Sequence, residues 1–241
     1  MPALVLLHAF PLDRSMWDRE VSALADVASS IIAPSFPGFG RTELAEHQPT
    51  LDDYADAVIA AMDAAHVDRA AIAGLSMGGY VALALWRRHR QRVERLALID
   101  TKAEGDTAEA AANRVRLAAM IREHGIEALL KAPPKWLREG SPHWDALRAM
   151  IRAQNKDAVA QAGVAMSTRP DSIKDLPTID VPTAVIVGEA DAITPLANAK
   201  TMADAIPGAS LSVIPDAGHI SNIEAPEAFE KAIRAWLRRP I

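Results

Sequence analysis

The sequence predicts an α/β protein with a mostly parallel sheet of about six strands, flanked by helices. Two observations carry this prediction. Short apolar runs alternate along the chain with longer stretches whose apolar residues recur at helical spacing. Half of the 241 residues are apolar, which is enough for a large core. Because strand and helix alternate, the sheet is expected to be parallel and to have helices on both faces.

Each predicted element follows from its local pattern. The strands are expected near residues 3–7, 30–34, 70–74, 95–100, 182–188 and 210–214. The helices are expected near residues 15–27, 51–66, 77–90, 195–206 and 226–238. In the second helix Leu51, Tyr54 and Val58 recur at steps of three and four, and Thr50 with Asp53 resembles a capping box.

One turn in this layout has the pattern of a nucleophile elbow. Gly74-Leu75-Ser76-Met77-Gly78 follows the strand near 70–74 and precedes the helix near 77–90. A serine at such a sharp turn has its hydroxyl pushed out of the sheet, and the positions two before and two after it must be very small. An ordinary glycine turn is the alternative, but the flanking strand and helix favour Ser76 as a nucleophile.

Two later strands end in residues that could serve Ser76. Asp191 follows the strand near 182–188, and His219 follows the strand near 210–214. The carboxyl ends of parallel strands lie at one edge of a sheet, where open α/β sheets carry their sites. We therefore expect Ser76, Asp191 and His219 to lie close together, in the chain order serine, acid, histidine.

The chain resembles the α/β-hydrolase superfamily, and it looks most similar to the branch of small carboxylesterases, 3-oxoadipate enol-lactonases and cofactor-free haloperoxidases. Five stretches in family order carry the resemblance: Leu7-His8-Ala9-Phe10-Pro11-Leu12, Phe36-Pro37-Gly38-Phe39-Gly40, the elbow, Gly188-Glu189-Ala190-Asp191, and Gly218-His219 through Glu224-Ala225-Pro226-Glu227.

The resemblance implies a role for each site residue. His219 takes the proton of Ser76 and later returns it to the leaving group, and Asp191 orients the imidazole. The backbone amides of Phe10 and Met77 are expected to form the oxyanion hole. Some members of the superfamily take their acid from the loop after the fourth strand, which makes Asp100 the alternative acid. The chain has Ala9 where this family commonly has glycine, and alanine fits there if its φ is negative.

The alternation of strands and helices breaks between the fourth and fifth strands. No strand is expected between Asp100 and Val181, where helical stretches are divided by prolines and glycines. We therefore expect one domain, residues 1–241, with a helical cap inserted at about 105–175. A cap over the site would exclude water and supply pocket walls. A purely structural insertion is the alternative reading.

Three side chains are candidates for contact with substrate. Trp136 and Met166 lie in the insertion, and Ile220 directly follows His219. Each of them could also be ordinary core, because apolar side chains at such positions often are.

Composition narrows the class of protein. The net charge of −5 gives no basic patch for nucleic acid, so no nucleic-acid partner is expected. The absence of cysteine excludes disulfides, a thiol nucleophile and cysteine-based zinc sites. The remaining histidines lack metal-ligand spacing, and neither a metal nor an organic cofactor is expected. No apolar stretch reaches the roughly 20 residues that span a membrane, and a cytoplasmic location is expected.

These observations predict a serine hydrolase that cleaves carboxylic esters of small acyl groups through an acyl-enzyme intermediate. The partner is a small-molecule ester or lactone. Alternatives are an enol-lactone hydrolase of aromatic catabolism, for which Lys135 and Arg138 could bind a carboxylate, and a perhydrolase or cofactor-free haloperoxidase. A receptor that binds a small molecule without turnover is an alternative of another class.

Overall fold

The computed structural model describes residues 1–240 and contains a six-stranded sheet in which every neighbouring pair is parallel. The strand order is β2-β1-β3-β4-β5-β6. The strands are β1 (Ala3–Leu7), β2 (Ser30–Ile32), β3 (Ala70–Leu75), β4 (Val93–Ile99), β5 (Thr183–Gly188) and β6 (Ser210–Ile214). The predicted α/β fold class is therefore confirmed, and each of the six predicted strands is present.

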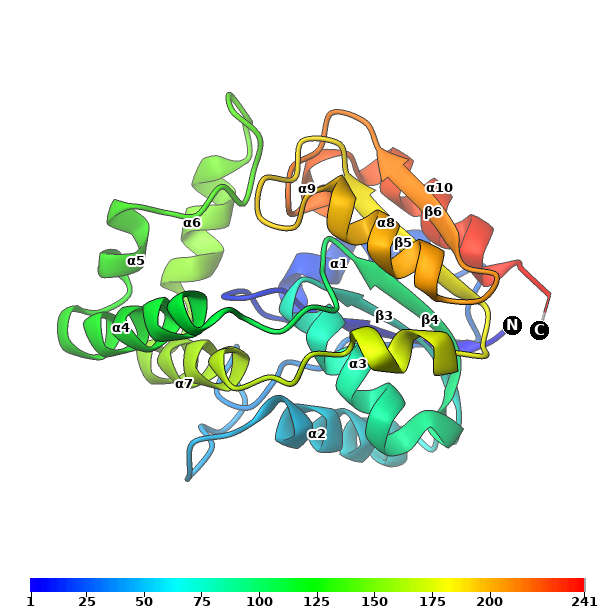
Figure 1. The fold of residues 1–241 in the computed structure, drawn as a ribbon, viewed down its shortest axis with the longest axis horizontal. Coiled ribbons are helices and arrows are strands. Elements are labelled where there is room, and N and C mark those ends of the chain that lie inside the picture. Colours follow the sequence, from blue (N-terminus) through cyan, green and yellow to red (C-terminus); the bar gives the residue numbers. More distant parts are fainter. Residues whose placement is uncertain (241) are drawn as a thin grey trace.

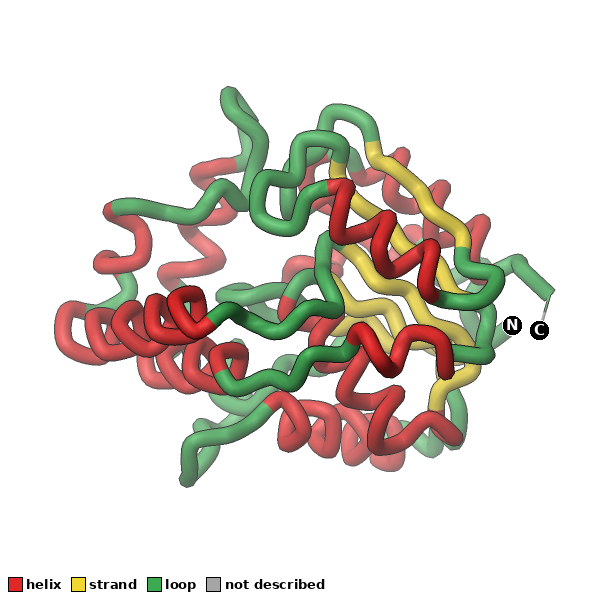
Figure 2. The backbone as a smooth tube through the Cα atoms, viewed as in Figure 1, coloured by secondary structure: helices red, strands yellow, loops and turns green. Residues whose placement is uncertain are grey.

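Helices cover both faces of the sheet (Figures 1 and 2). The helices outside the insertion are α1 (Asp18–Ala23), α2 (Leu51–Ala64), α3 (Met77–His89), α8 (Leu196–Ala205), α9 (Ser221–Glu224) and α10 (Pro226–Leu237). The helices α3 and α8 pack on the near face of the sheet in Figure 1, with α2 against α3. The helices α1 and α10 lie on the far face. This three-layer arrangement buries β1, β3 and β5 at every position.

The helix predicted near residues 15–27 is shorter and is divided in two. A 3₁₀ turn at Arg14–Trp17 comes first, begun by the Asp13 carboxylate, which accepts a hydrogen bond from the Ser15 N–H. Trp17 then has φ −103° and ψ 3°, outside the helical range, so α1 begins only at Asp18. The capping box predicted at Thr50 and Asp53 is confirmed, because each side chain accepts the other residue's backbone N–H.

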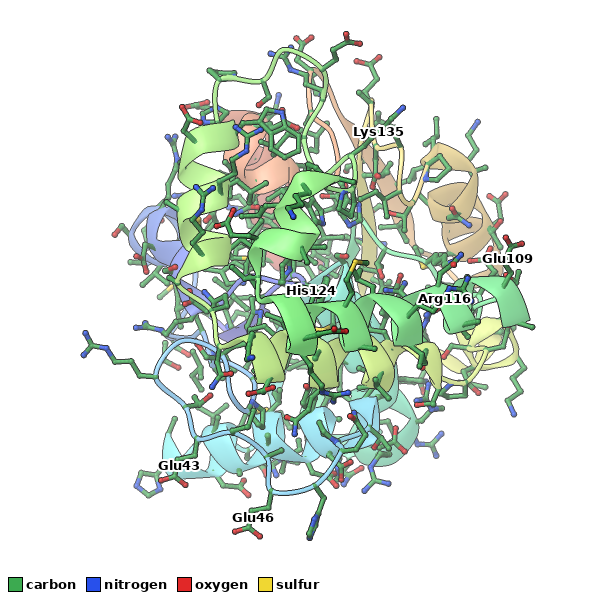
Figure 3. All side chains as sticks on the ribbon, turned by 90° about the vertical axis from the view of Figure 1, so that its left-hand side faces the viewer. Glu43, Glu46, Glu109, Arg116, His124 and Lys135 are labelled. Atoms are coloured by element: carbon green, nitrogen blue, oxygen red, sulfur yellow. The ribbon has the colours of Figure 1, made fainter. Side chains whose placement is uncertain are left out.

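Four α-helices and a 3₁₀ helix, Ile173–Thr178, separate β4 from β5, and the α-helices lie where the sequence predicts an insertion. They are α4 (Ala108–His124), α5 (Glu127–Lys131), α6 (Trp144–Arg152) and α7 (Lys156–Ser167). They gather beyond the carboxyl ends of the strands, on the left of Figure 1, and α4 packs along α7. Figure 3 faces this side and shows Glu109, Arg116 and His124 spread along α4.

The Asp106 side chain joins the two chain segments that connect helices α4 to α7 with the sheet. Its carboxylate lies 2.5 Å from the Arg114 guanidinium in α4 and 2.8 Å from the Arg169 guanidinium just after α7. The Arg169 guanidinium also stacks on the Tyr80 ring of α3, 4.1 Å from the ring centroid. The chain entering the insertion and the chain leaving it are thus held at one buried charged cluster.

Within residues 1–240, no helix combines the length and the apolar character that crossing a bilayer requires.

Candidate active site

Ser76 occupies the turn between β3 and α3 in a strained backbone conformation, with φ 57° and ψ −112°. A positive φ is rare for a residue with a side chain and persists only where its surroundings enforce it. Here the Ser76 N–H donates to the Ile99 carbonyl at 2.8 Å, and the Thr101 hydroxyl donates to the Ser76 carbonyl at 2.9 Å. Residues at the end of β4 therefore hold the elbow from one side.

The two glycines of the elbow are required by close backbone approach. A Cβ atom on Gly74 would lie 2.2 Å from the Gly78 carbonyl oxygen. A Cβ atom on Gly78 would lie 2.2 Å from the Leu7 carbonyl oxygen and 3.0 Å from that of His8. No side chain fits at either position, and the second contact brings the first turn of α3 against the end of β1.

The structure brings Ser76, His219 and Asp191 together. The Ser76 hydroxyl donates to His219 Nε2 at 2.8 Å, and His219 Nδ1 donates to Asp191 Oδ2 at 2.9 Å. The imidazole is buried, since 2% of the His219 side chain is exposed. Because a carboxylate can only accept, it fixes the proton on Nδ1 and leaves Nε2 free to accept from serine.

Asp191 is held as an ionised carboxylate by donors from its own loop. The Ile193 and Thr194 N–H groups donate to Oδ1 at 2.8 and 2.9 Å, and the Thr194 hydroxyl donates to Oδ2 at 2.7 Å. Burial alone raises the pKa of Asp191, but hydrogen bonds from His219 and Thr194 and the charge of His219 outweigh it and hold that pKa below its ordinary value. Sequence reasoning missed Thr194, although an aspartate side chain in a turn often accepts the backbone N–H two residues on, as Asp191 does from Ile193, and such a turn brings the next residue close.

Asp100, the alternative acid, is also buried, but its hydrogen bonds go to groups other than the imidazole. Its carboxyl accepts the Gly188 N–H at 2.7 Å and the Ser221 N–H at 3.2 Å, and it lies 2.5 Å from the Ser221 hydroxyl. Burial and the neighbouring charge of Asp191 raise the pKa of Asp100 well above its ordinary range. Asp100 thus links the strand that leads to Asp191 with the loop that carries His219.

Met77 directly follows Ser76, and Phe10 lies two residues after His8, whose carbonyl oxygen would be 3.0 Å from a Cβ atom on Gly78. Met77 begins α3, where the first N–H groups of a helix have no partner within the helix. Among residues 1–240, neither the Phe10 nor the Met77 N–H has a hydrogen-bond acceptor. The contact between Gly78 and the Leu7–His8 backbone brings the two segments together. Ala9, between His8 and Phe10, does not have a positive φ, so alanine is accommodated there.

His8 holds the Ala9–Phe10 segment in place through two hydrogen bonds of its ring. The Phe36 N–H donates to His8 Nε2 at 3.0 Å, which leaves the proton on Nδ1 to bond the Ala9 carbonyl at 3.0 Å. The ring is fully buried, and burial lowers the pKa of His8 to about 4. His8 is therefore neutral and joins the Ala9–Phe10 segment to the loop after β2.

Trp136, Met166 and Ile220 are all buried. The Ile220 N–H donates to the Trp136 carbonyl at 3.0 Å, so these two lie beside the His219 loop. The Met166 sulfur lies 3.6 Å from the Arg114 guanidinium, within the charged cluster around Asp106. Contact of these three side chains with substrate stays a prediction.

A cavity of about 390 Å³ lies between the insertion and the Asp191 loop. Lys135 and Leu137 line it from the insertion, and Ala190 and Ala192, on either side of Asp191, line it from the core. Its volume is in the range of small-molecule sites. The residues that line it are neighbours of Trp136 and Asp191 rather than these residues themselves.

Within residues 1–240, no group of three or more histidine, aspartate or glutamate side chains has the arrangement of a metal site. The chemistry that the arrangement does offer is proton transfer from a serine hydroxyl to the imidazole nitrogen that accepts its hydrogen bond. Such a set of groups suits nucleophilic attack on a carbonyl carbon.

Known proteins resemble the chain over nearly its whole length. The model of the alpha/beta hydrolase family matches residues 4–232. A thermophilic esterase from Thermogutta terrifontis is 37% identical with a TM-score of 0.93, over 99% of this chain and 90% of that one. The enol-lactonase from Burkholderia xenovorans LB400 is 33% identical with a TM-score of 0.89, over 99% and 92%.

A curated relative points to the same group. The 3-oxoadipate enol-lactonase 2 of Acinetobacter baylyi is 28% identical over 251 residues, which cover 99% of this chain and 89% of the relative. The chain therefore belongs to the alpha/beta hydrolase family, in the branch that contains esterases and enol-lactonases.

Proposed function

We propose that the protein is a serine hydrolase of carboxylic esters with small acyl groups, in which Ser76 is the nucleophile. One observation carries the proposal: the Ser76 hydroxyl, on a strained elbow, lies 2.8 Å from His219 Nε2, and His219 Nδ1 lies 2.9 Å from a carboxylate. The esterase that shares 37% of the sequence supports the same reaction class.

The first half of the reaction forms the acyl-enzyme. His219 Nε2 takes the serine proton as Ser76 Oγ attacks the ester carbonyl carbon. The carbonyl oxygen becomes an oxyanion, which the N–H groups of Phe10 and Met77 stabilise. When the carbon–oxygen bond of the ester breaks, His219 gives its proton to the departing alcohol, and Asp191 stabilises the imidazolium in the meantime.

The second half repeats these steps with water. A water molecule gives a proton to His219 and attacks the acyl carbon. The oxyanion forms again, and the bond to Ser76 Oγ breaks as His219 returns the proton to the serine. The products are a carboxylic acid and free enzyme, so the reaction needs no other reactant.

The helical insertion is part of this proposal as a cap over the site. The cavity between Lys135 and Leu137 on one side and Ala190 and Ala192 on the other supports it, because cap and core form that cavity together. A cap of this kind limits the access of water to the acyl-enzyme. The cytoplasmic location and the lack of a nucleic-acid partner stay predictions of the sequence.

Lactone hydrolysis is the second candidate. It uses the same residues, and the alcohol formed remains attached to the acyl group as the ring opens. The enol-lactonases at 33% and 28% identity favour it. So does Lys135, which lines the cavity and has no ion-pair partner among residues 1–240, because a cation there could bind the carboxylate of such a lactone.

The test compares wild type, Ser76→Ala and Ser29→Ala on p-nitrophenyl esters from acetate to octanoate and on α-angelica lactone, a simple enol-lactone. Ser29 is an exposed serine outside the site and serves as the matched control. We expect turnover by wild type and Ser29→Ala, a preference for short acyl chains, and loss of at least about 10³-fold in Ser76→Ala.

Four outcomes of this test are informative. Turnover of the esters above the lactone supports the esterase, and the reverse order supports the lactonase. Activity that survives in Ser76→Ala contradicts the nucleophile. If wild type binds these compounds but turns none of them over, the hydrolase proposal fails and a receptor role replaces it.

A further inference from the structure

Glu224 is a buried carboxylate that joins two parts of the chain far apart in sequence. It lies in α9, and 1% of its side chain is exposed. Its Oε2 accepts the Gly218 N–H at 2.6 Å and the Arg138 N–H at 3.1 Å. Gly218 directly precedes His219, and Arg138 belongs to the helical insertion. One carboxylate therefore bonds to the His219 loop and to the insertion at the same time.

A further hydrogen bond joins the His219 loop to the insertion, through the residue that follows His219. The Ile220 N–H donates to the Trp136 carbonyl at 3.0 Å. Both chain neighbours of His219 are thus bonded to the segment Trp136–Arg138, one through Glu224 and one directly. The contact is close as well, because a Cβ atom on Gly218 would lie 2.7 Å from Arg138 N and 3.0 Å from Leu137 C.

The partners of Glu224 indicate that the carboxylate acts mainly through the backbone. The Arg138 guanidinium Nε is 3.9 Å from Oε1, and 41% of that side chain is exposed, so solvent weakens this attraction. The hydrogen bonds from the Gly218 and Arg138 N–H groups are shorter, at 2.6 and 3.1 Å, and they go to a side chain that is 1% exposed. Without Glu224, both N–H groups would lose their acceptor inside the protein.

We propose that Glu224 is a positioning residue for His219, which it holds in place by fastening the Trp136–Arg138 segment of the insertion to the His219 loop. The inference rests on the proposed function, since it assigns Glu224 a part in the same site. Glu224 itself touches no reacting atom. Its effect comes from His219, whose two ring nitrogens must both keep hydrogen-bonding distance to Ser76 and Asp191.

The size of the effect follows from how strongly catalysis depends on alignment. A displacement of about 1 Å in a reacting group can cost about 10²-fold in rate. We therefore expect Glu224→Ala to lower kcat by about 10²-fold and to change KM by less than about threefold. Glu224→Gln can keep its one amide oxygen at the position of Oε2, which accepts both N–H groups, but its NH₂ then replaces Oε1, which lies 3.3 Å from the Arg138 N–H. A loss of roughly tenfold is therefore expected for it.

Glu227→Gln is the matched control. Glu227 lies three residues further on, at the start of α10, and 79% of its side chain is exposed beside Arg19. Its removal should leave kcat and KM unchanged. Thermal unfolding of all three variants, followed by circular dichroism, shows whether each one is folded at the assay temperature.

The division of the effect between kcat and KM distinguishes positioning from a general structural role. A misplaced His219 slows proton transfer without weakening substrate binding, so kcat should fall in folded Glu224→Ala and Glu224→Gln while KM stays within about threefold of wild type. A variant that has a lower unfolding temperature but the kcat of wild type would overturn the proposal.

Amide hydrogen exchange tests the junction without any substrate. We expect the Gly218 and Arg138 amides to exchange at least tenfold faster in Glu224→Ala than in wild type, with β3 and α3 unchanged. In Arg138→Met, which keeps its backbone N–H, both amides should stay protected. Equal protection in wild type and Glu224→Ala overturns the proposal even if wild type hydrolyses no ester, so its failure is distinguishable from failure of the proposed function.

Discussion

Asp100 and Asp191 lie at the ends of the neighbouring strands β4 and β5, and of the two only Asp191 bonds to His219. Asp100 bonds instead to Gly188 and Ser221, and it connects the Asp191 strand with the His219 loop. Two buried carboxyls this close repel each other when both are ionised. Their surroundings decide which of the two carboxyls is ionised. Hydrogen bonds lower the pKa of Asp191, whereas burial and the charge of Asp191 raise the pKa of Asp100.

Because of this difference, replacement by asparagine should lower kcat much more at Asp191 than at Asp100. Asp191→Asn should keep the fold but lower kcat by up to about 10⁴-fold, because an amide can leave the imidazole with the wrong tautomer. Asp100→Asn resembles a protonated carboxyl in shape and charge, so it should lower kcat by less than about tenfold.

The measurement is kcat for both variants on the ester that wild type prefers, with unfolding curves to verify the fold. Loss of activity in Asp100→Asn, with Asp191→Asn close to wild type, would make Asp100 the acid of the site.

Gly78→Ala should damage both stability and activity. Its Cβ would lie 2.2 Å from the Leu7 carbonyl oxygen, so α3 or β1 must move, at a cost of about 3 kcal/mol or more. The same movement displaces the Met77 N–H. Urea unfolding gives the change in free energy, and kcat on a short-chain ester gives the change in rate.

Gly163→Ala is the matched control for that variant. Gly163 lies within α7, and its Cβ would meet no atom closer than 3.8 Å. Alanine is a better helix former than glycine, so this change should raise stability by about 1 kcal/mol. Equal destabilisation by the two substitutions would contradict the close approach at Gly78.

His8 should make the fold less stable in acid. Burial lowers the pKa of His8 from 6.5 to about 4, so between these values the unfolded chain binds a proton that the folded protein does not. The His8 contribution is therefore full above about pH 6.5 and is lost as the pH falls toward 4. Between pH 7.5 and pH 5 the loss should be about 2 kcal/mol.

The free energy of unfolding of wild type and His8→Gln, measured in urea at both pH values, isolates this contribution. The variant should be less stable than wild type at pH 7.5. At pH 5 the difference between their free energies of unfolding should be smaller by about 2 kcal/mol. A gap that stays constant would mean that His8 is accessible to protons in the folded state.

Glu20 should make the fold less stable as the pH rises, which is the opposite of the effect of His8. Burial raises the pKa of Glu20 from 4.5 to about 7, so the folded protein holds a proton that the unfolded chain releases. Its contribution is full below about pH 4.5 and is lost as the pH rises through 7. Glu20→Gln removes this dependence, and relative to wild type it should gain about 2–3 kcal/mol between pH 5 and pH 8. Urea unfolding at the two pH values checks it, and parallel stability curves would refute a protonated Glu20.

The elements of the sheet follow from local sequence because apolar runs and helical repeats are local properties. The six strands and the Thr50–Asp53 cap are present as expected. The first helix was predicted too long, because the Asp13 cap and the break at Trp17 involve turn geometry that the apolar pattern does not encode.

The sequence by itself determined the parts of the site that depend on chain order: a serine at a glycine-flanked turn, and an acid and a histidine after later strands. A parallel sheet places all strand ends of one kind at one edge, so this order was enough to expect Ser76, Asp191 and His219 together. Only the tertiary structure decided which of two buried carboxyls meets the imidazole. It also decided that Glu224 bonds to Arg138, a residue 86 positions away. Both depend on the directions of side chains that loops bring together, and no local pattern specifies those directions.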